Sequence, residues 1–448
     1  MEQTAIKTHA FPLVPVFQIQ SIHIQHSLVM AQAHFLLLSI LVLNVYQQAA
    51  LEMKSIDLEA LAAIKNSLTD INPGSGNFFS TWDFTSPRPC STFSGVSCYL
   101  GRVTSLTLGT GLSDSPGLAG QLSPALSNLT QLTQLVLHPG IVTGPIPPQL
   151  ARLDNLRVIS LTNNRLTGSI PTSLSMLRKL HTLDLSQNQL TGSIPLGILT
   201  GLRELRVLIL ASNSLTGEFP SCSSGLLHLD LRNNRLRGTL PLEMPSSLRY
   251  LSISRNEMWG PINGLESLPD LEHLDLSMNQ FNGPIPHALL FRVRERGGSL
   301  SSLLLQRNNL SGGVPLPLPS SSPLLISEGS TVDLSHNSLS GELTGVLAGV
   351  ESLFLNNNRW TGKVPKEYVD SLYQGTTQTL YLQHNYITAF PLDPSLPLPD
   401  TVSLCFSYNC IAPPLPLGMA TCPASAGSRI SRPESQCMAF NNGSTVHH

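Results

Sequence analysis

The amino-acid sequence predicts an α/β solenoid, a curved stack of similar coils with a parallel β-sheet on its concave face and disulfide bonds at both ends. The pattern L-x-x-L-x-L-x-x-N-x-L-x-G-x-I/V/F-P recurs about ten times between Val103 and Tyr386, most clearly from Leu156 and Leu180. Six of the seven cysteines lie outside this stretch, two before it and four after it. A short unit of this kind buries its apolar face only by stacking on its neighbours, so the repeat predicts a solenoid of about twelve coils over residues 103–400.

The first fifty residues precede the repeats and contain one apolar run, Phe35–Leu43. These nine residues are too few to cross a membrane, which takes about 20, but they match the core of a signal peptide. We therefore expect residues 1–50 to be a signal-peptide region; a buried strand and an uncleaved anchor are the alternatives. Met30 stands just upstream of the run, and the only lysine or arginine before it is Lys7, so Met30 is a candidate for the true start.

An N-terminal cap is expected over residues 51–102. Asp57 is a plausible N-cap of an amphipathic helix, in which apolar residues follow at helical spacing as far as Leu68. The segment Asn72-Pro73-Gly74 then ends the helix. This helix can cover the edge of the first coil. Aromatic side chains supply further apolar bulk to the cap: Phe78, Phe79, Trp82 and Phe93.

Within each coil the half that carries the strand and the asparagine stays constant, whereas the returning half varies, so the coils span 21 to 29 residues. This asymmetry is expected where stacked strands fix one side and loops on the other side tolerate insertions. The coils begin near Val103, Leu132, Leu156, Leu180, Leu205, Leu226, Leu248, Leu271, Leu300, Gly329, Val350 and Thr377, and a degraded unit near Thr401 runs into the C-terminal cap.

The repeated residues are expected to be scaffold. The leucines point inward, the glycines permit a turn with unusual dihedral angles, and the asparagine amides satisfy backbone groups of neighbouring coils. The glycines are Gly168, Gly192, Gly217, Gly238, Gly260, Gly283, Gly312, Gly341 and Gly362. The asparagine column comprises Asn164, Asn188, Asn213, Asn234, Asn256, Asn279, Asn308, Asn337, Asn358 and Asn385.

Cysteines stand where a solenoid needs caps over its exposed core. Cys90 and Cys98 lie just before the first coil, and we expect them to form a disulfide bond in an oxidising compartment. Cys222 is left over in a shortened coil. A buried, inert thiol is the favoured interpretation there, and an intermolecular disulfide is the alternative.

The last four cysteines define a C-terminal cap over residues 401–437, followed by a flexible tail at 438–448. They allow three pairings, among which the sequence does not choose. A zinc site is the weaker alternative, because these residues form no C-x-x-C pair and no histidine falls between the first and the last of them. The four are Cys405, Cys410, Cys422 and Cys437.

Composition narrows the class of function. Only 12% of residues are charged, the net charge is −2 and aromatic residues make up 6%, which argues against a surface that binds nucleic acid or anionic membranes. Only eleven residues follow Cys437, without a hydrophobic tail, so we expect no direct membrane span and a released protein. No cofactor or metal is expected. Glycosylation is predicted at Asn128, Asn309 and Asn442, which head N-x-S/T sequons.

Two features resemble a known family. The ending L-x-G-x-I-P, as in the segment from Leu166 to Pro171, resembles the plant-specific subclass of leucine-rich repeats. The segment Pro89–Cys98 (PCSTFSGVSC) resembles that family's N-terminal cap, although the family usually has tryptophan where Phe93 stands. The resemblance implies a horseshoe or superhelix.

The end of the chain, from Tyr408 to Cys437, is similar to the C-terminal cap of certain plant receptor-like proteins. The resemblance covers roughly residues 51–437 and implies an extracellular recognition module of the receptor-like type. The sequence departs from receptor kinases in showing neither a transmembrane helix nor a kinase catalytic loop. We therefore expect any signal to pass through a partner, possible partners being a membrane receptor kinase and a peptide or protein ligand.

The residues between the leucines of each strand should face the concave side, because side chains alternate along a strand. A basic and aromatic set occupies the central coils, and arginine and tyrosine are common anchors of interfaces. Arg232, Arg255 and Arg307 share nearly one column and can grip a carboxylate with paired donors. An ordinary solvated surface is the favoured interpretation of this set, and a ligand-contact patch is the alternative. The candidate ligand-binding residues are Arg206, His228, Arg232, Arg249, Tyr250, Arg255, His273 and Arg307.

Other charged segments are expected to be solvated. The basic insertion from Phe291 to Gly298 is a second candidate for a contact surface, although a solvated return loop is favoured, and the segment Val314–Ser322 is rich in proline and serine. Four aspartates at one strand position are interpreted as a solvated ladder rather than as catalytic acids: Asp184, Asp230, Asp275 and Asp333.

The sequence is consistent with three classes of function, which it does not favour equally. The favoured one is a secreted, apoplastic recognition protein that binds a peptide, a wall component or a partner receptor ectodomain in cell-surface signalling or defence. The second is an inhibitor of a secreted pathogen enzyme that degrades cell walls, resembling plant polygalacturonase-inhibiting proteins. The third, an enzyme, is disfavoured because H-E-x-x-H, G-x-S-x-G and P-loop motifs are absent.

Overall fold

A computed structural model describes residues 53–71, 77–109, 117–222, 225–291, 300–317, 326–393, 395–412, 422–423 and 431–443. Several predicted features lie outside these ranges: the signal-peptide region, the Asn72-Pro73-Gly74 stop, all but the first residue of the basic insertion, most of the segment Val314–Ser322, and the end of the tail.

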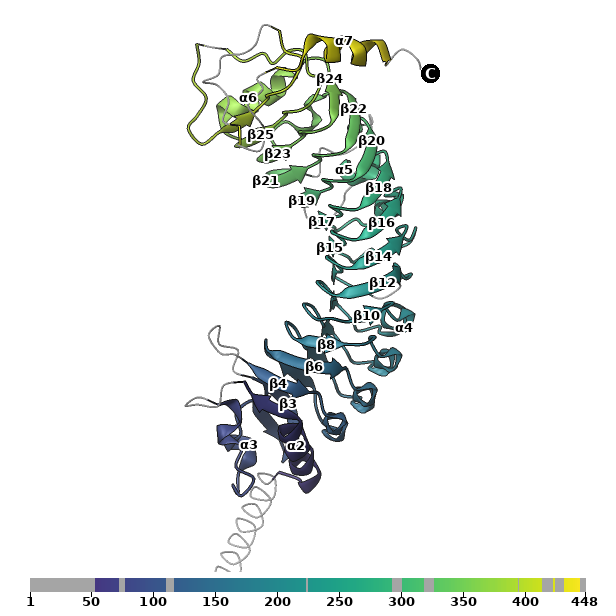
Figure 1. The fold of residues 1–448 in the computed structure, drawn as a ribbon, viewed down its shortest axis with the longest axis vertical. Helices are drawn as coiled ribbons and strands as arrows, with labels where there is room; N and C mark the ends of the chain where they lie inside the picture. Colours follow the sequence, from purple (N-terminus) through teal and green to yellow (C-terminus); the bar gives the residue numbers. More distant parts are fainter. Residues whose placement is uncertain are drawn as a thin grey trace, which may run out of the picture.

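The predicted solenoid is confirmed. A sheet of 14 strands runs the length of the described repeats, and the stack bends so that this sheet lines its inner side (Figure 1). All pairs in the sheet are parallel except the first, β2 with β3. In order the strands are β2(Val96–Tyr99), β3(Arg102–Leu108), β5(Gln134–Leu137), β7(Val158–Ser160), β9(Thr182–Asp184), β11(Val207–Ile209), β13(His228–Asp230), β15(Tyr250–Ser252), β17(His273–Asp275), β19(Leu300–Leu304), β21(Ile326–Asp333), β23(Ser352–Phe354), β25(Thr379–Tyr381) and β26(Ser403–Cys405).

The coils as far as that of β23 also carry a second short strand, which the sequence did not predict. These strands form a four-stranded sheet, β1-β4-β6-β8, and an eight-stranded sheet from β10 to β24. The positive-φ glycines of the L-x-G-x-I-P ending lie in or next to them, for example Gly192 with φ of 77°. The strands are β1(Leu68–Asp70), β4(Leu118–Gln121), β6(Ile141–Pro145), β8(Arg165–Thr167), β10(Thr191–Gly192), β12(Ser214–Glu218), β14(Arg235–Gly238), β16(Glu257–Gly260), β18(Gln280–Gly283), β20(Asn309–Gly312), β22(Ser338–Glu342) and β24(Arg359–Thr361).

Short helices occupy the returning halves, where coil length varies. Most are short, and a proline stands at or just before the start of most of them. Two, η2 and η3, begin with proline, which fits the first position of a helix. The longest is α6(Lys366–Gln374), which ends at Gly375 in the left-handed conformation. The others are η2(Pro124–Asn128), η3(Pro148–Arg152), η4(Thr172–Met176), α4(Leu196–Gly201), η5(Asn263–Ser267), α5(His287–Leu290) and η6(Gly345–Leu347).

The asparagine column has the predicted structural role. In Asn188 the side-chain Nδ2 donates to the carbonyls of Leu161 and Leu185 at 2.8 and 3.2 Å, and Oδ1 accepts from the Leu166 amide at 3.0 Å. One amide therefore joins two coils where water cannot reach the backbone. The column continues to Asn409, which the sequence analysis had left in the cap.

Replacing Asn188 with alanine should lower the free energy of unfolding by about 2 kcal/mol, because buried backbone groups of two coils lose their partner. Chemical denaturation measures this loss. The control is Asn282→Ala, since Asn282 is exposed on β18 and should change stability by less than about 0.5 kcal/mol. Equal losses in both variants would contradict the structural role of the column.

The N-terminal cap corrects one prediction. Helix α2(Ser55–Ser67) begins two residues before Asp57, so Asp57 is not the N-cap, and Leu68 starts strand β1 rather than ending the helix. The Asp57 carboxylate is 0% exposed and pairs with the guanidinium of Arg102 at 3.0 Å. It also accepts the backbone N–H of Val103 at 2.8 Å. The aspartate thus fastens the helix to the first strand of the repeats.

The predicted aromatic cluster of the cap is confirmed. Phe78 and Phe79, in η1(Phe78–Thr81), pack against Trp82, which stacks on Phe93 with ring centroids 5.2 Å apart. Trp82 Nε1 donates to the Ser94 carbonyl at 2.9 Å. Helix α3(Pro89–Thr92) holds the first cysteine of the cap.

Three disulfide bonds close the two ends. The predicted bond between Cys90 and Cys98 is present. At the other end Cys405 pairs with Cys422 and Cys410 with Cys437, which selects one of the three possible pairings. Cys222, as predicted, is buried, and it lies outside these three bonds.

The C-terminal cap is held by a cation between two rings. The guanidinium carbon of Arg432 lies 4.1 Å from the ring centre of Tyr386 and 4.6 Å from that of Tyr408. Helix α7(Glu434–Gly443) adds Phe440, which stacks on Tyr386 at 3.8 Å. The helix lies across the end of the stack in Figure 1, and strand β26 continues the main sheet beneath this region.

Candidate ligand-binding surface

Three rings form a stack on the central strands of the inner sheet. His228, Tyr250 and His273 occupy the same register position on β13, β15 and β17. Their ring centroids are 4.0 and 4.4 Å apart, and the ring planes differ by 3° and 4°. Strands lie about 4.8 Å apart, so the strand spacing itself places the rings face to face. All three side chains are half-buried. We call this set the ring ladder.

A column of carboxylates runs beside the ring ladder. The register confirms that the four aspartates share one strand position. They are not all solvated, as the sequence analysis expected: Asp230 is only 3% exposed. It accepts the backbone N–H of Arg232 at 3.1 Å, and Asp275 accepts that of Ser277 at 3.0 Å. Each carboxylate is thereby fixed by its own turn.

The guanidinium of Arg232 is held by an ion pair along one of its edges. Its Nε lies 3.3 Å from Oδ2 of the buried Asp230, while the arginine side chain remains 53% exposed. A guanidinium has five N–H donors, so an anchored Nε leaves the terminal nitrogens to meet a ligand oxygen. The arrangement positions Arg232 beside the ring ladder as a donor of fixed direction.

Two of the other candidate arginines have internal partners. Nη1 of Arg206 donates to the carbonyls of Arg203 and Gly225 at 3.1 and 3.2 Å, so this side chain joins one turn to the next coil. Arg249 pairs with Glu272 at 3.5 Å. Both lie at the starting edge of the strands, one residue before the ring ladder's column.

Arg255 and Arg307 stand where the strands end. Both have positive φ, 54° and 58°, as do the residues that precede the asparagine in most coils. Arg232 lies one position earlier in its own coil, because it is Asn233 that has the positive φ there. The three arginines were predicted to share nearly one column: Arg255 and Arg307 do share a column, and Arg232 stands one position before it.

Burial shifts the titration of the ring ladder and its neighbours. Desolvation lowers the pKa of His228 and of His273, although Asp230 and Asp275 oppose the shift. Desolvation likewise raises the pKa of Tyr250 and of Asp230. Near pH 7 the ladder is a neutral, polarisable strip beside fixed carboxylates.

These shifts predict how stability changes with pH. An unfolded imidazole titrates near its ordinary 6.5, and the folded protein binds the same protons only at lower pH. The unfolded chain therefore carries more protons just below pH 6.5, so the free energy of unfolding should fall as pH drops through that range. The raised pKa values of Asp230 and Asp333 have the opposite effect: at pH values above 3.8 they make the free energy of unfolding rise as pH drops.

Thermal unfolding between pH 7.5 and 5.5 (about two units around the imidazole pKa) measures the effect of the histidines. The variant His228→Gln with His273→Gln should show a flatter profile, and an unchanged profile would contradict this assignment.

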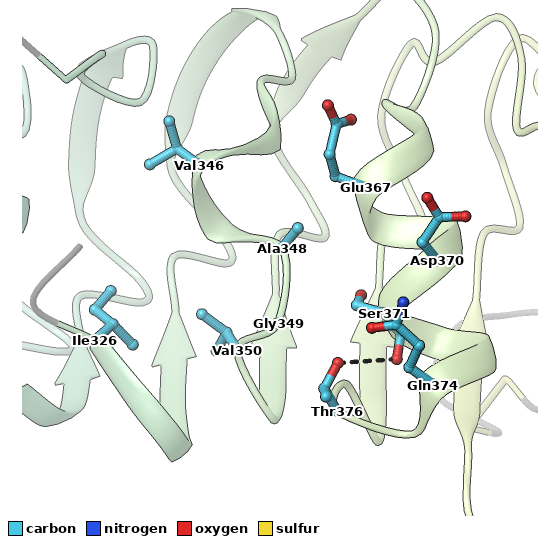
Figure 2. A pocket seen from close by; sticks show the side chains of 10 residues that line it. All are labelled: Ile326, Val346, Ala348, Gly349, Val350, Glu367, Asp370, Ser371, Gln374 and Thr376. Atoms are coloured by element: carbon cyan, nitrogen blue, oxygen red, sulfur yellow. Dashed lines mark hydrogen bonds between the residues drawn. The ribbon is translucent and has the colours of Figure 1, made fainter. Parts of the chain in front are cut away.

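A second hollow lies on the outer side of the solenoid, away from the ring ladder. Its volume is about 560 Å³. Figure 2 shows an apolar wall from the coil of η6, with Val346 and Val350, facing Glu367 and Asp370 on α6. Lys366 lies 3.7 Å from Asp370, and Thr376 donates to the Ser371 carbonyl at the foot of the helix. This hollow was not among the features predicted from the sequence.

Within the described ranges no group of three or more histidine, cysteine, aspartate or glutamate side chains is arranged to hold a metal ion. The same part of the chain holds no helix with the length and apolar character that a membrane crossing requires. The alternative zinc site at the C-terminal cysteines is excluded by their disulfide bonds.

Comparisons with family models match three kinds of segment. Residues 55–99 match the leucine-rich repeat N-terminal domain. Residues 154–202 match a model of two leucine-rich repeats, and residues 225–246 and 270–291 match single leucine-rich repeats. The matches fall on the cap and on the coils that the structure shows.

Two curated relatives come from Arabidopsis thaliana. Pollen receptor-like kinase 2 is 32% identical over 123 residues, which is 28% of this chain and 18% of the relative. Receptor-like protein 54 is 31% identical over 129 residues, which is 27% of this chain and 14% of the relative. The aligned part is less than a fifth of the length of either relative.

Two solved structures share the fold. The plant peptide hormone receptor RGFR1 in complex with RGF2 matches with a TM-score of 0.53 and 28% identity, over 69% of this chain and 53% of that chain. A plant ice-binding protein matches with a TM-score of 0.52 and 24% identity, over 77% of this chain and 100% of that one. The second likeness concerns the fold alone.

The coils, the caps and the matched models define a leucine-rich repeat protein. In its N-terminal cap and in the L-x-G-x-I-P ending of its coils the chain is similar to plant-type leucine-rich repeat receptor-like proteins.

The ring ladder is the feature that sequence reasoning did not assemble. All three of its residues were named as candidates, but as members of a loose basic and aromatic set. In three successive coils, one of these residues stands directly before the second leucine of L-x-x-L. Aligning the coils on that leucine would have placed the rings side by side.

Proposed function

We propose that this protein recognises a peptide or protein ligand on its inner sheet, outside the cell. The observation that carries this proposal is the ring ladder with the anchored Arg232 beside it. A ring held between two others loses little freedom on binding, so contact with a ligand costs less entropy. Tyrosine and arginine are also the residue types that most often dominate binding energy.

The breadth of the surface suits an extended or loop-shaped ligand. Thirteen parallel strands, β3 to β26, cover the inner side, and strands repeat about every 4.8 Å, so the surface extends for about 60 Å. The similarity to the plant peptide hormone receptor RGFR1 in complex with RGF2 supports a peptide as the ligand. A wall component and a partner receptor ectodomain are further candidates for the same surface, in signalling or defence.

We propose a secreted or apoplastic location, with a membrane receptor kinase as the partner that carries the signal. Three disulfide bonds suit an oxidising compartment. Asn128 and Asn309 are exposed, as glycosylation requires, and both lie off the inner sheet, in η2 and β20. Asn442 stands in α7. Glycans on the first two would leave the inner sheet open.

Affinity capture tests this proposal. The mature protein is immobilised, incubated with a cell-surface extract, and the bound material is read by mass spectrometry. We expect a ligand or receptor ectodomain that is retained by the wild type and lost by Arg232→Glu combined with Arg255→Glu. The matched control reverses two exposed arginines of the second sheets, Arg235 on β14 and Arg359 on β24, and should retain the partner.

Retention by both double variants would contradict binding on the inner sheet. A separate mixing assay addresses the inhibitor alternative: inhibition of a pectin-degrading enzyme by the purified protein would favour that function over the receptor-like one.

A further inference from the structure

The ring ladder has an open end. His273 is its last ring, and the face of that ring turned away from Tyr250 points toward strand β19. The residue in the same column there is Ser302, which the register places next to His273. A serine side chain has only two heavy atoms and cannot extend over an imidazole ring. One strand spacing beyond His273 there is therefore room for one more planar group, which we call the stacking position.

Two carboxylates flank the stacking position. Leu304 lies two residues after Ser302 on β19 and belongs to the column of the aspartates. Its register partners are Asp275 on β17 and Asp333 on β21. Strands repeat every 4.8 Å or so, which puts the two carboxylates about 9.6 Å apart. Asp275 accepts from the Ser277 amide at 3.0 Å and Asp333 from the Ser335 amide at 2.9 Å. Oδ2 of Asp275 also accepts from the Ser252 hydroxyl at 3.4 Å. The turns thus fix the two carboxylates on the strands on either side of Leu304.

Cations already near these carboxylates do not fill the position. Arg249 is paired with Glu272 at the starting edge of the strands. Arg307 stands at the opposite edge, exposed and with φ of 58°, and acts on Asp333 and His336 through its charge. Burial raises the pKa of Asp333, although the charge of Arg307 opposes the shift.

The chemistry of the stacking position selects among ligand groups. A neutral aromatic ring would stack on His273 but would desolvate two carboxylates without pairing them, which is costly. A lysine ammonium would pair with them but has no plane to stack. A guanidinium does both, because it is flat, charged and carries donors along its edges.

We propose that the stacking position binds an arginine side chain of the peptide ligand, with its guanidinium continuing the ring ladder between Asp275 and Asp333. This inference rests on the proposed function, since it names the ligand chemistry of the same inner surface. It makes His273 the contact ring and the two aspartates the charge partners.

A displayed library of random linear peptides is the probe. Peptides are selected on the wild-type protein and re-tested on Tyr250→Ala, and those that lose affinity are taken as inner-sheet binders. We expect these binders to share an arginine. Replacing that arginine with lysine should weaken binding about tenfold, because the stacked plane is lost.

Three variants then locate the arginine. Ser302→Tyr fills the stacking position with a ring of the protein itself and should weaken the arginine peptides about thirtyfold. Ser352→Tyr, in the same column two strands further on, is the matched control and should stay within about threefold of wild type. Asp275→Asn with Asp333→Asn should weaken binding about tenfold and remove the preference for arginine over lysine. Unchanged thermal unfolding verifies that each variant is folded.

The outcomes separate the two proposals. Inner-sheet binders without arginine, or arginine peptides that bind Ser302→Tyr as well as they bind Ser352→Tyr, overturn this inference and leave the proposed function standing. Selected peptides that are all insensitive to Tyr250→Ala overturn the proposed function and this inference together.

Discussion

Replacing Asp57 with alanine is expected to lower the free energy of unfolding by about 3 to 5 kcal/mol, the usual cost of removing one partner from a buried ion pair. The carboxylate is fully buried, whereas the side chain of Arg102 is 18% exposed, so the lower end of that range is the more realistic value. Without the carboxylate, the guanidinium of Arg102 and the amide of Val103 lose their acceptor under helix α2. The cap should then separate from the first coil before the rest unfolds.

Chemical denaturation monitored by circular dichroism measures this effect. The first transition is assigned to the cap, because the parts of a solenoid can unfold separately. Asp83→Ala is the control, since Asp83 is an exposed aspartate of the same cap whose carboxylate accepts from the nearby Thr85. A loss in Asp57→Ala no larger than that in Asp83→Ala would mean that the ion pair does not hold the cap.

Replacing Tyr250 with alanine is expected to weaken ligand binding about thirtyfold or more, which corresponds to about 2 kcal/mol, the threshold of an interface hot spot. The change removes the central ring, so His228 and His273 lose the partner that holds their planes parallel. Binding of the captured partner, measured by surface plasmon resonance, tests the expectation.

The control for this variant is Trp259→Ala. Trp259 is an aromatic residue of β16 in the second sheet, 53% exposed, and its loss should leave affinity within about threefold of wild type. The opposite pattern, with Trp259 required and Tyr250 dispensable, would move the binding surface to the outer sheets.

Much of the fold followed from the sequence because its physics is local to each coil. The spacing of leucine and asparagine fixes which side chains point inward, as Asn188 and its equivalents show. The cap helix was less predictable. Asp57 matched the composition of an N-cap, but its partner Arg102 lies 45 residues away in sequence, and no local pattern reveals such a pairing. The second sheets, whose strands are two to five residues long, were not predicted.

On the candidate surface, too, the features local to each coil were predictable and the contacts between side chains were not. The register places His228, Tyr250 and His273 together, which periodicity already implied. The behaviour of the arginines depended on individual contacts. Arg206 donates to the Gly225 carbonyl of the following loop, and Arg232 is anchored by a carboxylate that was expected to be solvated. Burial of Asp230 results from crowding by its neighbours on adjacent strands, which a single strand pattern does not show.

Hydroxyl-radical footprinting of the protein with and without its captured partner tests the central claim most directly. We predict that modification of His228, Tyr250 and His273 falls on binding, while modification of the exposed Trp259 on the second sheet stays the same. Unchanged modification of the three rings together with protection of Trp259 would contradict recognition by the inner sheet.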